Sequence, residues 1–370
     1  MRIALVNRRF DATGGGTERD LLVTAQLLTA AGHQVTIYAA EVRRQNPGVD
    51  VRSLMSLPFG RALRLLVFGL RAAAVARRDG ADLVVSFARA INADIMRSGG
   101  GAHKSYIAAA RQWQGTTGQA LMRLSPYHRV QLALERAAFR SRQTRRVIAV
   151  SELVRRDLVR SFGLPDPRVK LLYNGVDLRR FVPSRDRSRS NPLRSRLGLG
   201  SATAIAFIGN GFARKGLWFL LEAWPMVDSR ARLLVAGVDR SLKAYQRRAT
   251  QLGIGDRVIF LGKCADVAEL LTAVDGLALP SLFEPFGNVV IEAMAAGLPV
   301  LCSQQTGAAE LIPPVLRELI VTDPTDVEEL GRRLKLLLKI DGDATQLLRS
   351  TAEQYSWERY GWELQRILSF

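Results

Sequence analysis

The stretch Thr203-Ala-Ile-Ala-Phe-Ile-Gly-Asn-Gly-Phe-Ala-Arg-Lys-Gly216 combines an apolar run, a glycine-rich turn and the start of a helical pattern that continues over Leu217–Trp224. The apolar run predicts a buried strand. Glycines let the backbone approach a ligand closely, a helix N-terminus favours anions, and Arg214 and Lys215 add two cations there. The stretch therefore predicts a strand–loop–helix unit of an α/β fold. The loop could bind a diphosphate, or it could be a flexible turn with two solvated charges.

The same alternation of apolar runs and helical patterns fills the chain on both sides of that stretch. Strands are predicted at residues 2–6, 34–39, 83–87, 146–150, 203–208, 232–236, 258–261, 276–279 and 300–302. Strands that alternate with helices imply parallel sheets covered on both faces. We therefore expect two doubly wound domains. In the first helix, expected near residues 17–31, Thr17 and Asp20 have the spacing of a capping box.

The boundary between the domains is expected within Val182–Gly200, a segment with almost no apolar residue. Its arginines are Arg185, Arg187, Arg189, Arg194 and Arg196. We predict an exposed linker or surface loop whose charges are solvated, in preference to an anion-binding segment.

Length and composition exclude several classes of protein. The 370 residues allow two domains, and 53 Lys and Arg against 34 Asp and Glu give a net charge of +19. Residues 1–182 carry +17 of that excess. No run approaches the roughly 18 apolar residues of a spanning helix. No secretory leader is evident, and Cys264 and Cys302 lack the spacing of a zinc site, so we expect a cytoplasmic protein.

A second motif, Ser281–Val300, places two carboxylates near a predicted strand end. Glu284 lies in a Pro/Gly turn, and Glu292 lies within an otherwise apolar helical run. A carboxylate among apolar neighbours must face either solvent or a polar ligand. Both could accept hydrogen bonds from sugar and ribose hydroxyls. The alternatives are a loop acid for Glu284 and an exposed helix face for Glu292.

The frame Glu284-Pro-Phe-Gly-Asn-Val-Val-Ile-Glu292 resembles the signature of the family 4 glycosyltransferases, which are retaining enzymes with the GT-B fold. Other segments resemble the family in the same order. They are Gly14-Gly15-Gly16, Val150-Ser151-Glu152, Asn174-Gly175-Val176-Asp177 and Arg214-Lys215-Gly216. Within the family, the stretches Gly15–Asp20 and Asn210–Gly216 are most similar to those of enzymes that glucosylate the lipopolysaccharide core.

The resemblance implies a fold and a domain division. Two Rossmann-like domains would flank a cleft, with a C-terminal helix crossing back to the first domain. Residues 1–180 with 355–370 would form the acceptor-side domain, and residues 181–354 the donor domain. The implied reaction is retaining transfer of a hexose, glucose from a UDP-linked donor, to a membrane-associated acceptor such as the lipopolysaccharide core.

The resemblance also implies roles for individual residues. Arg214 and Lys215 would hold the donor diphosphate, Glu284 the hydroxyls of the transferred sugar, and Glu292 the ribose. Further donor contacts are implied for Gly15, Gly16, Gly262, Lys263, Phe286, Gly287 and Asn288. Asp20 would lie near the sugar or acceptor, unless it only caps a helix. His103, which follows a glycine turn, would contact the donor sugar.

No cofactor and no metal are expected. Asp341-Gly342-Asp343 has the Asp-x-Asp pattern of metal-dependent transferases, but it lies far from the other motifs and is predicted to be a turn. Cations and helix dipoles would instead offset the diphosphate charge. Of the other histidines, His33 is given no role, and His128 is expected at the surface.

Two other classes of function compete with this interpretation. A nicotinamide dehydrogenase would explain the first glycine turn and Glu41 after the second strand, but Gly14-Gly15-Gly16 is not GxGxxG. The high charge suggests a nucleic-acid binder, but no nucleic-acid-binding motif accompanies it, and we expect no such partner.

The charge of the first half has another explanation. Arginines are interleaved with apolar and aromatic residues over Lys104–Arg146. Such a composition suits the surface of an anionic membrane, or else a core with a solvated basic face. We expect peripheral association with the inner face of the cell membrane, which would bring a lipid-linked acceptor to the first domain.

Overall fold

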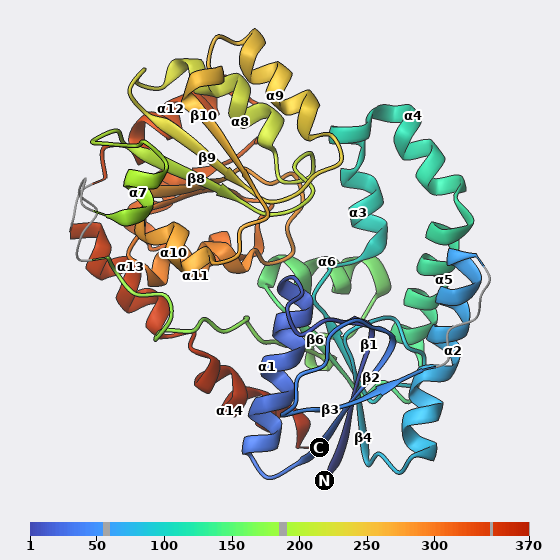
Figure 1. The fold of residues 1–370 in the computed structure, drawn as a ribbon. Helices are drawn as coiled ribbons and strands as arrows, with labels where there is room; N and C mark the ends of the chain where they lie inside the picture. Colours follow the sequence, from blue (N-terminus) through green and yellow to red (C-terminus); the bar gives the residue numbers. More distant parts are fainter. Residues whose placement is uncertain (55–59, 185–190, 341–342, 370) are drawn as a thin grey trace. The chain divides into compact units, whose positions relative to one another are not determined.

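The computed structural model describes residues 1–54, 60–184, 191–340 and 343–369. It divides into two compact units (Figure 1). The first consists of Met1–Gly175 and Trp357–Phe370, and the second of Val176–Ser356. The chain passes between the units after Gly175 and again after Ser356, and the segment Val182–Gly200, in which the boundary was expected, lies within the second unit.

The first unit is built on a parallel sheet whose strands follow the order β3-β2-β1-β4-β5-β6-β7. The strands are β1 (Arg2–Phe10), β2 (Gln34–Val42), β3 (Asp50–Ser53), β4 (Leu83–Ser86), β5 (Ile95–Ser98), β6 (Arg146–Ala149) and β7 (Val169–Leu171). Its helices are α1 (Gly16–Ala30), α2 (Arg61–Arg78), α3 (His103–Ala109), α4 (Arg111–Leu124), α5 (Pro126–Arg140), α6 (Glu152–Phe162) and α14 (Trp357–Leu368). The order reverses between β1 and β4, as in a doubly wound fold.

The C-terminal helix α14 belongs to the first unit, which confirms the expected crossing (Figure 1). Its apolar residues recur at helical spacing and form one buried stripe. They are Trp357, Tyr360, Leu364 and Leu368. The stripe joins the core cluster of Ile3 and Leu5 from β1 and Leu21 from α1. Residues from the two ends of the chain thus share one core.

The second unit has a six-stranded parallel sheet in the order β10-β9-β8-β11-β12-β13. The strands are β8 (Ala204–Ile208), β9 (Arg232–Ala236), β10 (Val258–Gly262), β11 (Gly276–Leu279), β12 (Val300–Ser303) and β13 (Ile320–Val321). The helices are α7 (Pro192–Arg196), α8 (Leu217–Ala223), α9 (Leu242–Gln251), α10 (Val267–Thr272), α11 (Asn288–Ala295), α12 (Val327–Leu337) and α13 (Asp343–Glu353). The prediction of two doubly wound domains is confirmed.

The arginine-rich boundary segment differs from the expected solvated loop. Asn191 caps the short helix α7, and Arg194 within that helix is only 3% exposed. The Arg194 guanidinium donates to the carbonyl of Ala273 and pairs with Asp275 at 3.3 Å. Arg194 therefore ties this segment to the second unit. Arg185, Arg187, Arg189, Asp341 and Gly342 lie outside the described residues, and Asp343, predicted to be in a turn, begins α13.

Candidate active site

The candidate site of the second unit lies where its strand order reverses. Strands β8 and β11 are neighbours in the sheet although 67 residues lie between the end of β8 and the start of β11, and the strands that follow them, β9 and β12, lie on opposite sides of this pair. In open parallel sheets, ligands bind at the carboxyl ends of the strands at this switch point. The loop after β8 carries Arg214 and Lys215, and the loop after β11 carries Glu284.

These three side chains meet. Lys215 Nζ lies 2.6 Å from Glu284 Oε2, and an Arg214 guanidinium nitrogen lies 3.0 Å from the same oxygen. Arg214 also donates to the carbonyl of Phe283 at 2.6 Å, which fixes its guanidinium against the second loop. The side chain of Lys215 is 10% exposed and that of Glu284 is 13% exposed. The sequence separates these residues by about 70 positions, and the fold brings them into one cluster.

The electrostatics of the cluster keep Glu284 ionised. Burial opposes ionisation, but the charges of Lys215 and Arg214 outweigh it and lower the pKa of Glu284 to about 2. One carboxylate is thus shared by two cations. Two cations and one carboxylate give the cluster a net positive charge. This charge favours the binding of an anion such as a diphosphate.

Two glycines permit this arrangement. Gly209 has φ +147°, and a Cβ there would lie 2.3 Å from Lys215 Cε, so the lysine stem occupies the space that any side chain would take. Gly287 has φ +91°, and its Cβ would lie 3.2 Å from Glu284 Cγ. The glycines of both loops therefore serve to pack the charged residues closely.

Helix α11 places Phe286, Gly287 and Asn288 at its N-terminus and Glu292 one turn further along. Phe286 and Gly287 are buried and Asn288 is half-buried. Glu292 is only 4% exposed, so the alternative of a solvated helix face is wrong. Every residue of the helix after Asn288 is buried, and α13 of the second unit packs against it. A carboxylate in such a place needs polar partners.

Gly262 is the last residue of β10, an edge strand of the same sheet, and Lys263 follows it. Gly262 has φ +67°, and its carbonyl accepts a hydrogen bond of 2.7 Å from the backbone of Gly237. Lys263 is exposed. Both therefore lie at the carboxyl end of the sheet, on the side of β8 away from β11.

In the first unit, Gly15 and Gly16 begin helix α1, where Gly15 is the N-cap residue. Both are exposed. A Cβ on Gly15 would meet only the far end of Glu18, at 3.8 Å, so packing does not require glycine at that position. The helix begins before Thr17, and the predicted capping box of Thr17 and Asp20 is therefore wrong.

Asp20 points into the unit, where it is 4% exposed. Its carboxylate pairs with the buried Arg97 of β5 at 3.0 Å and accepts a hydrogen bond of 3.1 Å from Asn174. Arg97 also donates to Asn174 at 2.6 Å, and its guanidinium lies 4.8 Å from the centre of the Phe87 ring. The structure therefore places Asp20 in a closed polar cluster of the first unit.

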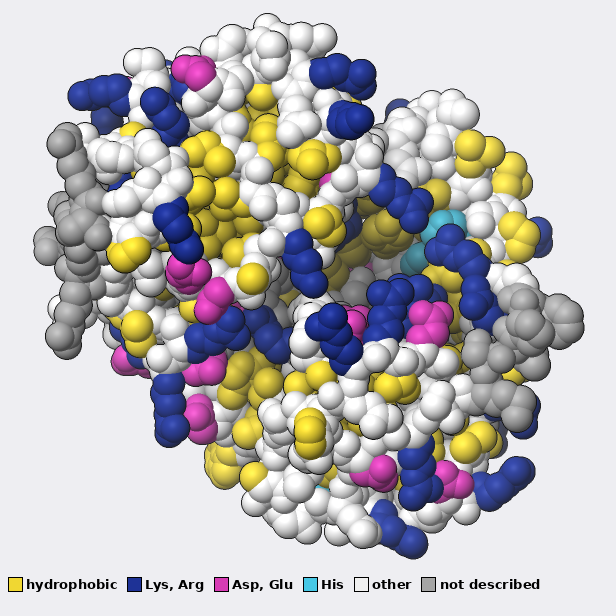
Figure 2. Space-filling model, in the orientation of Figure 1, with side chains coloured by type: hydrophobic (Ala, Val, Ile, Leu, Met, Phe, Trp, Pro, Cys, Tyr) yellow, Lys and Arg dark blue, Asp and Glu magenta, His cyan; other side chains and the backbone are white. Residues whose placement is uncertain are grey.

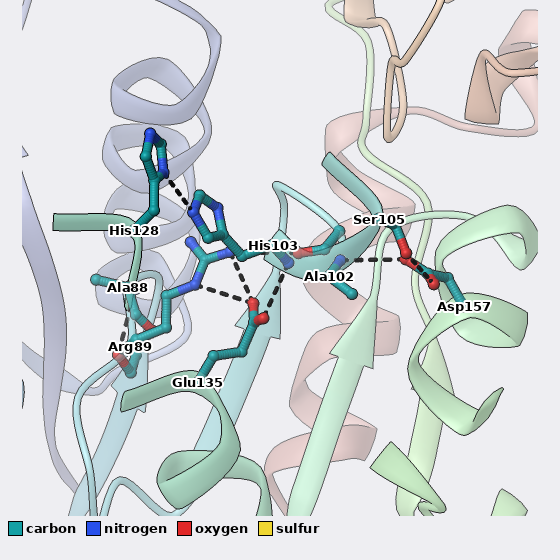
Figure 3. A network of polar contacts seen from close by, with 10 residues as sticks. Ala88, Arg89, Ala102, His103, Ser105, His128, Glu135 and Asp157 are labelled. Carbon is teal, nitrogen blue, oxygen red and sulfur yellow. Dashed lines mark hydrogen bonds and ion pairs between the residues drawn. The ribbon is translucent and has the colours of Figure 1, made fainter. Parts of the chain in front are cut away.

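His103 is the first residue of helix α3 and is 9% exposed (Figure 3). Its backbone N–H donates to Glu135 at 2.9 Å, and Glu135 pairs with Arg89 at 2.9 Å. Its ring Nε2 lies 2.9 Å from Nδ1 of His128 on α5. His128 is half-buried and contacts other side chains, so its expected place at the surface is wrong.

The buried ring of His103 makes the stability of the protein depend on pH. Burial, and then the charges of Arg89 and His128, lower the pKa of His103 to about 3 from the usual 6.5. Below pH 6.5 the unfolded chain binds a proton that the folded chain does not, so stability falls as the pH falls from 6.5 towards 3.

We expect the free energy of unfolding to drop by about 1.4 kcal/mol per pH unit below 6.5 on account of His103. Urea unfolding between pH 7 and pH 5 measures this slope. His103→Gln should have a visibly flatter slope than the wild type, and equal slopes in both proteins would contradict the assignment.

The two halves of the chain match two glycosyltransferase models. Residues 14–180 match the one described as Glycosyltransferase Family 4, and residues 202–339 match Glycosyl transferases group 1. The chain is a family 4 glycosyltransferase. This membership supports neither the dehydrogenase nor the nucleic-acid interpretation. Glu41, the acid on which the dehydrogenase interpretation relied, is paired with Arg9 at 2.7 Å.

Individual relatives agree with the family. The lipopolysaccharide glucosyltransferase WaaG of Escherichia coli K12 is 26% identical over 340 residues, which cover 88% of this chain and 86% of the relative. Several other curated glycosyltransferases match over only about half of their own length.

Solved structures share the fold. The crystal structure of WaaG, a glycosyltransferase involved in lipopolysaccharide biosynthesis, has a TM-score of 0.81 at 22% identity and covers 99% of both chains. Anabaena HepE in complex with UDP-glucose has a TM-score of 0.76 at 20% identity, covering 100% of this chain and 99% of its own. At these identities the likeness shows a GT-B fold.

Sequence reasoning missed several residues that hold the first unit's candidate residues in place. They are Arg89, Arg97, His128, Glu135 and Asn174. Asn174 stands in a segment that the resemblance had singled out, which was a usable signal. The others lie in a short strand, a loop and a helix without any local motif.

Proposed function

We propose that the chain is a retaining, metal-independent hexosyltransferase that moves glucose from UDP-glucose to a membrane-associated acceptor such as the lipopolysaccharide core. The observation that carries the proposal is the contact of Lys215 and Arg214 with Glu284 at the switch point of the second sheet. The similarity to the lipopolysaccharide glucosyltransferase and to a fold that binds UDP-glucose supports the donor and the acceptor.

The donor diphosphate is assigned to Arg214 and Lys215. Both are already oriented by Glu284 and by the carbonyl of Phe283, so little reorganisation is needed when an anion arrives. Preorganised cations stabilise the charge that develops on a leaving nucleotide. Backbone amides of Phe286, Gly287 and Asn288 add partial positive charge at the start of α11. In the first unit, Gly15 and Gly16 have exposed backbone, to which we assign a donor contact.

This supply of positive charge is the basis for proposing a reaction without a metal. The reaction breaks the bond between the anomeric carbon and the phosphate oxygen, and it forms a bond from that carbon to the acceptor oxygen on the same face. The acceptor proton passes to the departing phosphate. Glu284, which is held ionised, accepts hydrogen bonds from hydroxyls of the transferred sugar. His103 is assigned to the transferred sugar. The cluster that contains Asp20 is assigned to the neighbourhood of the sugar or the acceptor.

The ribose is assigned to Glu292, and the base to Gly262 and Lys263. We expect Glu292→Gln to weaken UDP binding by about 1.5–3 kcal/mol, because a charged hydrogen bond is replaced by a neutral one. Calorimetry with UDP measures the change. Glu328→Gln, an exposed acid at the start of α12, is the matched control. Wild-type affinity in a folded Glu292→Gln variant would refute the assignment.

The membrane contact is assigned to the exposed face of α4 and α5. Leu121 is 65% exposed and Leu124 is 71% exposed, and Arg123 lies between them. Figure 2 shows hydrophobic and basic side chains side by side in the region of α4. Within the described residues, no helix is both long and apolar enough to traverse a bilayer. Leucines beside arginines suit insertion at the level of anionic headgroups.

Liposome sedimentation tests the membrane contact. We expect binding to vesicles that contain anionic lipid, and a decrease in binding as salt increases, because each basic residue near the surface contributes about 1 kcal/mol. Leu121→Ser combined with Leu124→Ser should reduce the bound fraction. Equal binding to neutral and anionic vesicles, or binding to neither, contradicts the proposal.

The donor and acceptor are tested by a screen of nucleotide sugars. UDP, GDP and ADP forms of glucose, galactose and mannose are incubated with the protein, and the released nucleotide is measured. Active donors are then offered with truncated lipopolysaccharide cores, and the product linkage is determined by NMR. We expect UDP-glucose to release nucleotide faster than the other donors, and we expect the product to be an α-glucoside. An inverted product, or a requirement for added divalent metal, would overturn the proposed mechanism.

A further inference from the structure

The histidine pair of the first unit has a geometry that fixes the proton on each ring. His103 Nε2 and His128 Nδ1 lie 2.9 Å apart, which is a hydrogen-bond distance. The two ring planes are nearly parallel, with an angle of 19° between them and 5.1 Å between the ring centres. A hydrogen bond between two imidazole nitrogens needs one N–H and one lone pair, so the rings must hold complementary protons.

The rings have little freedom to leave this arrangement. The backbone N–H of His103 is fixed by Glu135, whose carboxylate is in turn held by Arg89 (Figure 3). The His103 ring stacks on Tyr106 with 5.6 Å between ring centres, and Tyr127 meets the His128 ring edge-on at 5.3 Å. His128 is a residue of α5, and Figure 3 shows its ring directed towards the ring of His103.

Both rings are neutral at physiological pH. Burial and the charge of Arg89 lower the pKa of His103, and burial and the charge of Arg61 lower the pKa of His128. A neutral pair joined by one hydrogen bond has two possible arrangements of its protons. Either both rings carry the proton on Nε2, or both carry it on Nδ1. The Nε2–H form is the intrinsically commoner form of neutral histidine, and only the first arrangement gives it to both rings.

We propose that His128 is a positioning residue that holds His103 in its Nε2–H form, so that Nδ1 of His103 presents a lone pair to a substrate hydroxyl. The inference rests on the proposed function, in which His103 contacts the transferred sugar. Nδ1 of His103 makes no hydrogen bond within the described part of the chain, whereas Nε2 is used by His128. His103 thus accepts a hydrogen bond from the sugar and does not act as an acid.

The proton arrangement can be observed directly because the chain contains only three histidines. In protein labelled with ¹⁵N-histidine, His103→Gln and His128→Asn assign the ring signals. We expect His103 to show a protonated Nε2 and an unprotonated Nδ1 at pH 7, and a coupling across the hydrogen bond to His128. A protonated Nδ1 on His103 would overturn the proposal without any reference to activity.

Turnover tests the positioning role. His128→Phe keeps a ring but loses the acceptor, and we expect UDP-glucose hydrolysis to fall about tenfold, the worth of one orienting hydrogen bond. His128→Asn places an amide oxygen near the former Nδ1 and should retain turnover within about threefold. UDP affinity should stay unchanged in both variants. His33→Asn, the same substitution at a histidine without a proposed role, is the control.

The outcomes separate this inference from the proposed function. If His103→Ala lowers turnover and His128→Phe does not, His128 has no positioning role, although the proposed function stands. The same holds if His128→Asn is as impaired as His128→Phe, because the loss then follows from packing alone. If Lys215→Ala and His103→Ala both keep full turnover, the proposed function fails and the role of His128 fails with it.

Discussion

Replacing Lys215 by Ala is expected to lower glucosyl transfer by about 100-fold or more, because a preorganised charge beside the leaving group stabilises the transition state by several kcal/mol. Lys215 Nζ lies 2.6 Å from Glu284, so the substitution also removes one of the two cations that keep this buried carboxylate ionised. The effect should therefore appear mainly in kcat, measured as UDP release with saturating donor.

Two controls accompany this experiment. Lys215→Met keeps the aliphatic stem that packs on Gly209 and removes only the charge, so it should be as inactive as the alanine variant. Lys243→Ala removes an exposed lysine of the same unit and should leave kcat unchanged. Wild-type turnover in a folded Lys215→Met protein would show that the diphosphate is bound elsewhere.

Replacing Asp20 by Ala is expected to destabilise the protein by about 3–5 kcal/mol, because it leaves the buried Arg97 without its carboxylate. Arg97 and Asp20 are each 4% exposed, and their ion pair has little access to water. Urea unfolding measures the loss. Glu363→Ala, which breaks the i,i+4 pair with Arg359 on the surface of α14, should cost less than about 1 kcal/mol.

A double substitution shows whether the cost comes from the uncompensated charge. Asp20→Leu with Arg97→Met removes both charges, and it should recover much of the stability that Asp20→Ala loses. An Asp20→Ala protein that unfolds like the wild type, but has lost transfer activity, would indicate direct contact with substrate in place of the structural cluster.

The sequence predicted most strands of the second unit because they are short apolar runs bounded by glycine or charge. Strands β9 and β11 have the bounds that this pattern indicated. Strand β5 was missed. It lies in the middle of the first sheet, but its third residue is Arg97, and a central strand with an arginine lacks the apolar signature. Only the tertiary pairing with Asp20 makes this charge tolerable.

The candidate donor-site residues could be proposed from the sequence because the signature places them in two short segments. Their mutual geometry could not, since it depends on β8 and β11 becoming neighbours. Burial also decided what local patterns left open. Glu292 had two interpretations until the helix around it was found to be enclosed. His128 was wrongly expected at the surface because its partner, His103, lies 25 residues away on another helix.

The stripe of α14 in the core of the first unit has a consequence for biosynthesis. The ribosome makes residues 176–356 after most of the first unit and before α14. The surface of β1 and α1 that later meets Trp357, Tyr360 and Leu364 remains uncovered throughout that interval. The second unit, by contrast, is continuous in sequence. It can complete its core first, and the unit that begins the chain is the last to finish folding.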